Sequence, residues 1–170
     1  MTSTIILIGV SGAGKSDIAR AIAAKSGLVL HNFEESFESL MGEDDSQFLV
    51  RRGEAQYEEA ALRVAMDLLD REGVITLAPG VVRTQKVAEK LRVLRAGGAL
   101  VVEVFADIST LMRRTGLNAP RSVALGPTRK IFTEMVAAYR ADFEGLADLV
   151  IDTSLSKPEH VAARVLAFDA

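Results

Sequence analysis

The 170-residue sequence contains no cysteine, which excludes disulfide bonds and thiolate metal sites. Its two histidines, His31 and His160, are far apart in the sequence, which argues against a histidine-based metal site. Long basic runs are absent and the formal net charge is −3, so we expect no nucleic-acid partner and no anionic membrane surface. No apolar run approaches the length of a membrane span, and no basic leader with a cleavage site precedes the first apolar run. We therefore expect a cytoplasmic protein.

The composition that remains is typical of a globular chain. Hydrophobic residues make up 49% and charged residues 25%, and a length of 170 residues suits one domain with a sizeable core. No internal repeat or low-complexity segment divides the sequence. We expect a single domain over residues 1–170 that acts as a monomer.

The most informative stretch is residues 4–27. Its apolar run, Ile5-Ile6-Leu7-Ile8, is too short for a helix and rich in β-branched residues, so it predicts a buried strand. The next eight residues, Gly9-Val10-Ser11-Gly12-Ala13-Gly14-Lys15-Ser16, match the pattern G-x-x-x-x-G-K-[ST]. A helical pattern follows and ends at Gly27.

This order of strand, glycine-rich loop and helix is what a nucleotide phosphate requires. The glycines allow several backbone N–H groups to point into one concavity, and the helix start adds partial positive charge. Lys15 contributes a full charge and Ser16 a hydroxyl for Mg²⁺, while Asp17 complements the helix dipole. The predicted nucleotide-binding residues are Gly12, Ala13, Gly14, Lys15, Ser16 and Asp17.

The rest of the chain alternates between short apolar runs and helical patterns. We expect further strands at residues 28–31, 74–77, 99–105 and 148–151. We expect two further helices that begin after Asn32 and Asp107 as caps, and a third at residues 85–95 with Thr84 as its cap. We also expect helices at residues 59–71 and 129–144, and one from Ser156 onward. Such alternation predicts an α/β fold with three α/β/α layers, a five-stranded parallel sheet and ligands at the carboxyl ends of the strands.

Two segments break this pattern. Residues 42–58 are polar with two glycines, and we expect a small helical insertion there, over a cleft on the substrate side. Residues 116–128 hold two glycines and two prolines without periodicity, which is typical of a mobile lid that closes over a substrate.

Phosphoryl transfer needs cations around the moving group and a carboxylate near the acceptor hydroxyl. Arg121 in the predicted lid could neutralise charge on the transferred group, and Glu34 could hold the acceptor hydroxyl. Arg140 could bind an acidic acceptor, and Arg114 could stack on adenine. The alternatives remain open: a solvated loop arginine, an acidic residue in the first turn of a helix, and exposed helix arginines.

With these residues the chain resembles the shikimate kinase family, a group of small P-loop kinases related to nucleoside-monophosphate kinases. The resemblance covers nearly the whole length and includes residues 53–57, 73–80, 113–116 and 147–153. The family uses ATP and Mg²⁺ to phosphorylate the 3-hydroxyl of shikimate. The resemblance implies that Lys15 and Ser16 hold phosphates and metal, that Arg121 is the lid arginine, and that Arg114 packs on adenine.

The departures from the family pattern gather on the acceptor side. Asn32 and Glu34 stand where the family has two aspartates, which orient metal-bound water and grip the shikimate hydroxyls. Glu58 replaces an arginine that binds the shikimate carboxylate, and Ala78-Pro79-Gly80 replaces three glycines. Ser122 replaces the proline after the lid arginine, and Arg140 matches a second carboxylate-binding arginine only if one following residue is dropped. The residues that the resemblance assigns are Ser16 and Asn32 for the metal, and Glu34, Gly80 and Arg140 for the substrate.

Three functions are therefore in competition. The chain is an ATP-dependent kinase of shikimate, or a kinase of another hydroxylated acceptor that is less acidic or even basic, or a nucleotide-binding protein without catalysis. Glu58 favours the second, because it repels an anionic substrate that an arginine would attract. Asn32 and the altered pocket favour the third.

Overall fold

The computed structural model describes residues 2–116 and 128–170. Arg121, and nearly all of the lid predicted at residues 116–128, lie outside the described residues.

A five-stranded parallel sheet with strand order β2-β3-β1-β4-β5 forms the centre of the protein. β1 lies in the middle and is buried along its whole length, because helices cover both faces of the sheet. Its Ile6 pairs with Ile75 on one side and with Val101 on the other. The strands are β1 Thr4–Ile8, β2 Leu30–His31, β3 Gly73–Thr76, β4 Leu100–Phe105 and β5 Leu149–Asp152. The predicted α/β fold with five parallel strands is confirmed.

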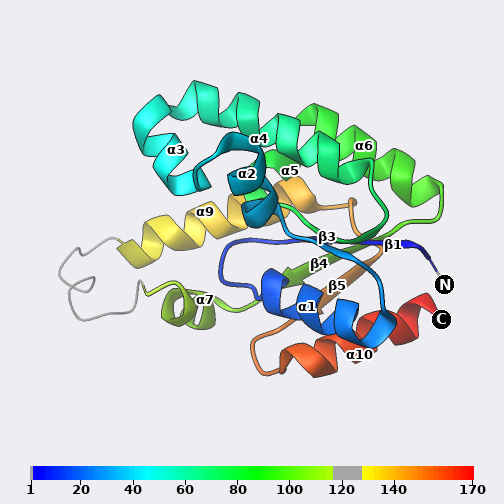
Figure 1. The fold of residues 1–170 in the computed structure, drawn as a ribbon. Helices are drawn as coiled ribbons and strands as arrows, with labels where there is room; N and C mark the ends of the chain where they lie inside the picture. The colour runs from blue at the N-terminus through cyan, green and yellow to red at the C-terminus, as the bar shows by residue number, and fades with distance from the viewer. Residues whose placement is uncertain (1, 117–127) are drawn as a thin grey trace.

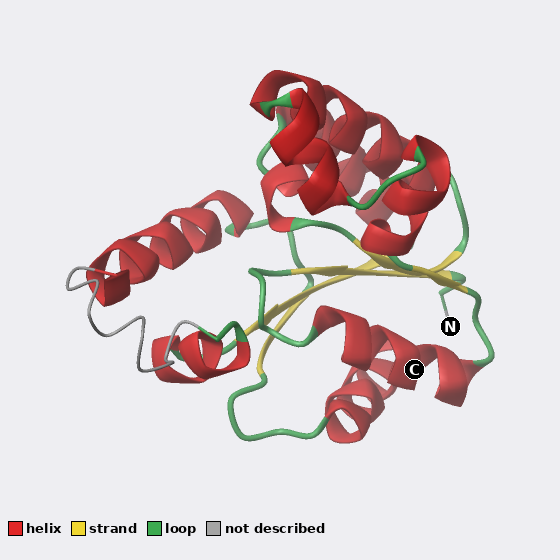
Figure 2. Cartoon of the chain, turned by 60° about the vertical axis from the view of Figure 1, so that its left-hand side comes forward, coloured by secondary structure: helices red, strands yellow, loops and turns green. Residues whose placement is uncertain are grey.

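Two layers of helices enclose this sheet (Figure 1), and Figure 2 shows the sheet between them. Helices α1 and α10 pack together on one face. The other face carries α4 and α6, with α2, α3 and α5 nearby, while α9 contacts both α5 and α7. The helices of the described residues are α1 Lys15–Ser26, α2 Phe33–Met41, α3 Asp45–Arg52, α4 Glu54–Leu69, α5 Pro79–Val82, α6 Gln85–Ala96, α7 Ile108–Arg114, α9 Thr128–Phe143 and α10 Pro158–Asp169.

Two predicted helix caps are present, whereas the hydroxyl of Thr84, the predicted cap of α6, donates to the backbone oxygen of Val81 and makes no capping hydrogen bond. The Asn32 side chain accepts a hydrogen bond from the backbone N–H of Glu35 at the start of α2. The Asp107 side chain accepts one from the N–H of Thr110 at the start of α7, and this bond lowers the pKa of Asp107. Each cap satisfies a backbone donor that has no partner within its helix.

Other boundaries differ from the expectation. Helix α4 begins at Glu54, not at residue 59, because its first turn is exposed and the apolar spacing starts only at Ala60. Gly53, with φ of 84°, lies between α3 and α4 and so ends one helix and starts the next. The segment expected to be a turn begins α5, since Pro79 needs no N–H partner in a first helical turn.

The carboxyl ends of three neighbouring strands position the candidate site. The glycine-rich loop follows β1, Asn32 follows β2, and Ala78 lies shortly after β3. These ends meet at one edge of a parallel sheet, where open α/β sheets bind their ligands.

Candidate active site

The loop of residues 9–16 is shaped by glycines that no other residue could replace without a shift. A Cβ atom at Gly9 would lie 2.2 Å from the backbone oxygen of Val104 on the neighbouring strand. Gly14 precedes α1 with φ of 97°, in the left-handed region. The loop can therefore bend closely over the end of β1 and deliver the chain to the start of α1, where backbone N–H groups favour an anion.

Lys15 lies inside this loop. Its Nζ donates hydrogen bonds to the backbone oxygens of Gly9, at 2.6 Å, and Val10, at 3.2 Å. Burial lowers the pKa of Lys15 to about 8, and the negative charge of Glu34 acts in the opposite direction. A desolvated cation beside a helix start suits a phosphate, which agrees with the predicted role of Lys15.

Ser16 and Asn32 lie next to each other, as the metal-site prediction requires. The Nδ2 of Asn32 donates to the Oγ of Ser16 at 3.0 Å, while Oδ1 caps α2. Asn32 is only 5% exposed, so its amide is held in this orientation. Within residues 2–116 and 128–170 there is no cluster of three or more histidine or acidic side chains that could hold a metal. The Ser16 hydroxyl is an oxygen donor of the kind that Mg²⁺ prefers, and a Mg²⁺ held there would need phosphate and water oxygens for most of its other ligands.

Arg114 ties the loop to the far end of the chain. Its Nη1 donates to the backbone oxygen of Gly12 at 3.1 Å, and its Nη2 donates to that of Thr153 at 3.0 Å. The Thr153 hydroxyl is 2.8 Å from the backbone oxygen of Ala13, to which it donates. The structure thus brings together Gly12, Ala13 and Arg114, which the sequence analysis assigned to the nucleotide.

A cavity of about 260 Å³ adjoins this part of the loop. Residues that line it include Ala13, Gly14, Asp17 and Arg114. Its place beside the loop and Arg114 suits the base of a nucleotide. Asp17 also forms an exposed ion pair with Arg20 at 2.9 Å.

Thr153 supports the phosphate loop, a role that was not predicted from the sequence. It is 2% exposed and follows β5, so its hydroxyl supports the loop from the opposite end of the chain. A lone threonine carries no local motif. The only available signal was its place in the stretch of residues 147–153 that resembles the family.

A second cavity, of about 470 Å³, lies between α3, α4, α5 and α9, and we call it the acceptor cavity. Gly80, which was predicted to bind the substrate, lines it. The side chains of Tyr57, Glu58, Arg83 and Tyr139 line it as well. A small polar molecule would therefore meet both charged and aromatic groups there.

Glu34 links the loop electrostatically to the acceptor cavity. It is exposed in the first turn of α2, and its charge acts on Lys15 and also on Tyr57. Burial, followed by the charges of Asp45 and Glu34, raises the pKa of Tyr57 to about 12. The charge of Glu34 thus acts on both the phosphate loop and the cavity wall, which is what a contact between Glu34 and an acceptor hydroxyl would require.

Arg140 is not brought to the acceptor cavity. Its Nε lies 2.9 Å from Oε2 of Glu103, and its guanidinium lies 3.9 Å from the centre of the Phe105 ring. The preceding residue, Tyr139, lines the cavity, whereas Arg140 does not. Successive residues on a helix are about 100° apart, so these two neighbours point in different directions.

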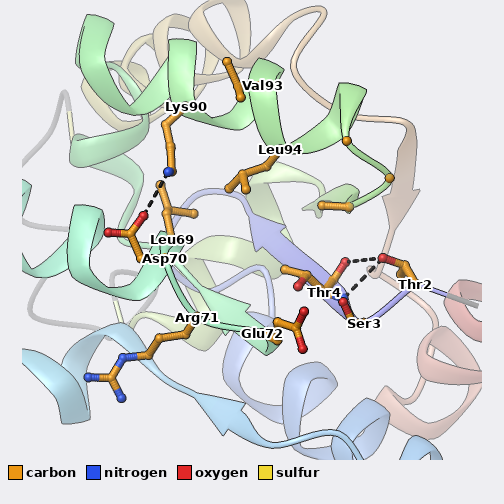
Figure 3. Close-up of a pocket in the computed structure, with 13 residues that line it drawn as sticks. Thr2, Ser3, Thr4, Leu69, Asp70, Arg71, Glu72, Lys90, Val93 and Leu94 are labelled. Carbon is orange, nitrogen blue, oxygen red and sulfur yellow. Dashed lines mark hydrogen bonds and ion pairs between the residues drawn. The ribbon is translucent and has the colours of Figure 1, made fainter.

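A larger cavity, of about 680 Å³, lies at the opposite edge of the sheet (Figure 3). Thr4, the first residue of β1, lines it together with the ion pair between Lys90 and Asp70, whose atoms are 2.9 Å apart. Because the phosphate loop follows the other end of β1, this cavity does not belong to the candidate site.

The sheet order, the loop after the central strand and the lysine within it define a P-loop kinase fold. A sequence model of the shikimate kinase family matches residues 11–170. The shikimate kinase of Streptomyces coelicolor is 32% identical over 165 residues, covering 95% of this chain and 92% of that protein. The shikimate kinase of Paramagnetospirillum magneticum is 31% identical, covering 96% of this chain and 82% of that protein. The chain belongs to the shikimate kinase family, whose phosphate donor is ATP.

Solved structures show the same fold. Shikimate kinase from Acinetobacter baumannii in complex with shikimate has a TM-score of 0.84 at 17% identity, covering 99% of this chain and 93% of that one. A gluconokinase from Sinorhizobium meliloti has a TM-score of 0.63 at 18% identity, covering 99% of this chain and 91% of that one. No helix of the described residues has the length and apolar character needed to cross a membrane.

Proposed function

We propose that this protein transfers the γ-phosphoryl group of ATP to the 3-hydroxyl of shikimate. The observation that carries the proposal is Lys15 held in the phosphate loop, together with Glu34, whose charge acts both on Lys15 and on Tyr57 in the wall of the acceptor cavity. Membership of the shikimate kinase family over residues 11–170 supports shikimate as the acceptor. So does the fold shared with a shikimate kinase solved with shikimate.

In this proposal each predicted residue has a physical task. Lys15 and the loop N–H groups bind the phosphates, and Arg114 borders the base. Glu34 accepts a hydrogen bond from the acceptor hydroxyl and orients it toward the γ-phosphate. Arg121 supplies positive charge to the transferred group when the lid closes.

Ser16 would hold Mg²⁺, and Asn32 would keep the Ser16 hydroxyl in place. When bound, Mg²⁺ neutralises negative charge on the phosphoryl group. The proposal further treats the chain as one kinase domain that acts as a monomer, with residues 42–58 on the acceptor side and residues 116–128 as the lid. The cytoplasmic location expected from the sequence stays a prediction.

A second candidate is a kinase for a hydroxylated acceptor without a carboxylate. Glu54 and Glu58 both line the acceptor cavity and form no ion pair with another described residue. Arg140, which was expected to attract an acidic acceptor, forms an ion pair with Glu103. The third candidate, nucleotide binding without catalysis, is supported by Asn32, because an amide offers no negative charge to a metal or its water.

A coupled ADP-release assay with and without shikimate tests the proposal, together with calorimetry of ATP binding. Shikimate-stimulated ADP release at millimolar shikimate, with formation of shikimate 3-phosphate, is the expected result. Tight ATP binding without stimulation by shikimate would refute it. A panel of polyols and amino alcohols would then separate the second candidate, which predicts stimulation by one of them, from the third.

A further inference from the structure

The charges around the acceptor cavity are unbalanced. Among the described residues that line it, Arg83 is the single cationic side chain, while Glu54 and Glu58 are anionic. The two glutamates are four residues apart on α4 and therefore lie on the same side of the helix. A carboxylate that entered this cavity would be repelled by both glutamates, and Arg83 is the one described lining residue that would attract it.

Arg83 comes from the same element as the predicted substrate contact Gly80. It follows α5 directly as its C-terminal cap, three residues after Gly80. Because α5 begins just after β3, at the carboxyl edge of the sheet, Arg83 is carried to the wall of the cavity.

The guanidinium of Arg83 is held but not buried. Its Nε donates to Oδ2 of Asp142 at 2.6 Å, and its central carbon lies 4.4 Å from the centre of the Tyr139 ring. Hydrogen bonding to Asp142, and to a lesser extent to Tyr139, raises the pKa of Arg83, so the side chain stays charged at any working pH. The side chains of Arg83 and Asp142 are 41% and 46% exposed, so their ion pair is a weak one that can exchange for another carboxylate.

The chemistry of the group matches an acidic ligand. A guanidinium has five N–H donors in a planar fork that can bind a carboxylate through two hydrogen bonds. Asp142 lies outside the set of described residues that line the cavity, whereas Tyr139 lines it and packs against the guanidinium. A ligand carboxylate in the cavity can thus take the place of Asp142 without a change of the backbone.

We propose that Arg83 is a specificity-determining residue, which binds the carboxylate of the acceptor in exchange for Asp142. This inference rests on the proposed function, because it concerns the carboxylate of shikimate. It assigns the binding of the anion to the residue that caps α5. The preference of the protein for an acidic acceptor then depends on the attraction by Arg83 outweighing the repulsion by Glu54 and Glu58.

The test is calorimetric binding of shikimate and of its uncharged methyl ester, in the presence of a non-hydrolysable ATP analogue. Arg83→Met should weaken shikimate binding about tenfold, the loss of one charge-assisted contact at a partly exposed site. Binding of the ester should change less than twofold. Arg83→Lys should fall between, since an ammonium keeps the charge but loses the two-point geometry.

Two further variants sharpen the experiment. Asp142→Asn removes the competitor and should tighten shikimate binding several-fold. Arg92→Met is the matched control: Arg92 is exposed on α6, has no ion pair with a described residue, and should leave both ligands unaffected. Thermal melting of each variant confirms that it is folded.

The outcomes separate this inference from the proposed function. Shikimate-stimulated ADP release that Arg83→Met leaves unchanged, in KM as well as kcat, would overturn the inference and leave the function standing. Shikimate binding that depends on Arg83 without ADP release would support the inference and refute the function. Equal binding of shikimate and its ester by the unaltered protein, or no binding of either, would overturn the inference.

Discussion

Replacing Arg140 with methionine would leave the buried carboxylate of Glu103 without its partner. The Glu103 side chain is 5% exposed and the Arg140 side chain is 38% exposed. Breaking a fully buried ion pair costs about 3–5 kcal/mol, and the exposure of Arg140 reduces this to about 2 kcal/mol for Arg140→Met. In a chain of this length that corresponds to a fall in Tm of about 4–8 °C.

The assay is thermal and urea unfolding of the variant, combined with the KM for shikimate. We expect the stability to fall and the KM to stay within about twofold, because Arg140 does not line the acceptor cavity. The double variant Arg140→Met/Glu103→Gln should recover much of the lost stability, since it leaves no unpaired charge. Arg92→Met again serves as the exposed control.

One result would refute this reasoning. If Arg140→Met raised the KM for shikimate about tenfold or more while Tm stayed unchanged, Arg140 would be a substrate contact, as the sequence analysis expected. The ion pair with Glu103 would then be of no consequence for the fold. The experiment thus decides between a structural and a binding role for the same side chain.

Three further predictions concern the site. The pKa of Lys15 is lowered to about 8, and bound phosphates favour the charged lysine, so ATP binding near pH 8.5 should take up a proton. The binding enthalpy measured by calorimetry should therefore vary with the ionisation enthalpy of the buffer. An enthalpy independent of the buffer would contradict this. Asn32→Asp places a negative charge beside Ser16 and should lower the Mg²⁺ concentration for half-maximal activity several-fold, whereas an unchanged requirement would place the metal elsewhere. Glu58→Gln should lower the KM for shikimate several-fold, because it removes a repulsive charge from the acceptor cavity. Glu59→Gln is the control, since Glu59 does not line that cavity, and it should leave the KM unchanged. Equal effects of the two variants would show that the repulsion does not come from the charge inside the cavity.

The pH dependence of stability follows from the same lysine. Because the folded-state pKa of Lys15 lies below its ordinary value of 10.5, folding disfavours the charged form. This penalty on stability is fully present below about pH 8 and fades as the pH rises toward 10.5. A bound anion would favour the charged form of Lys15 and would therefore oppose this penalty.

The sequence by itself determined the phosphate loop, the parallel sheet and two helix caps. Each of these depends on neighbours in the chain: the glycines and Lys15 act within eight residues, and Asn32 and Asp107 each cap a backbone N–H three residues away. The short, continuously apolar runs also predicted the three layers, because a strand that is apolar on both faces must have helices packed on both faces of its sheet.

Tertiary structure decided which side chains line the acceptor cavity. Arg140 was the better candidate by charge, yet the rotation of α9 directs it to Glu103 and leaves Tyr139 on the cavity wall. Thr153 supports the loop across 140 residues of sequence from Ala13, a contact that no local pattern encodes. Arg83 has no motif at all. Patterns of neighbouring residues predict where helices, strands and loops form. Which side chains meet depends on the rotation of each helix about its axis and on the packing of strands that are distant in the sequence.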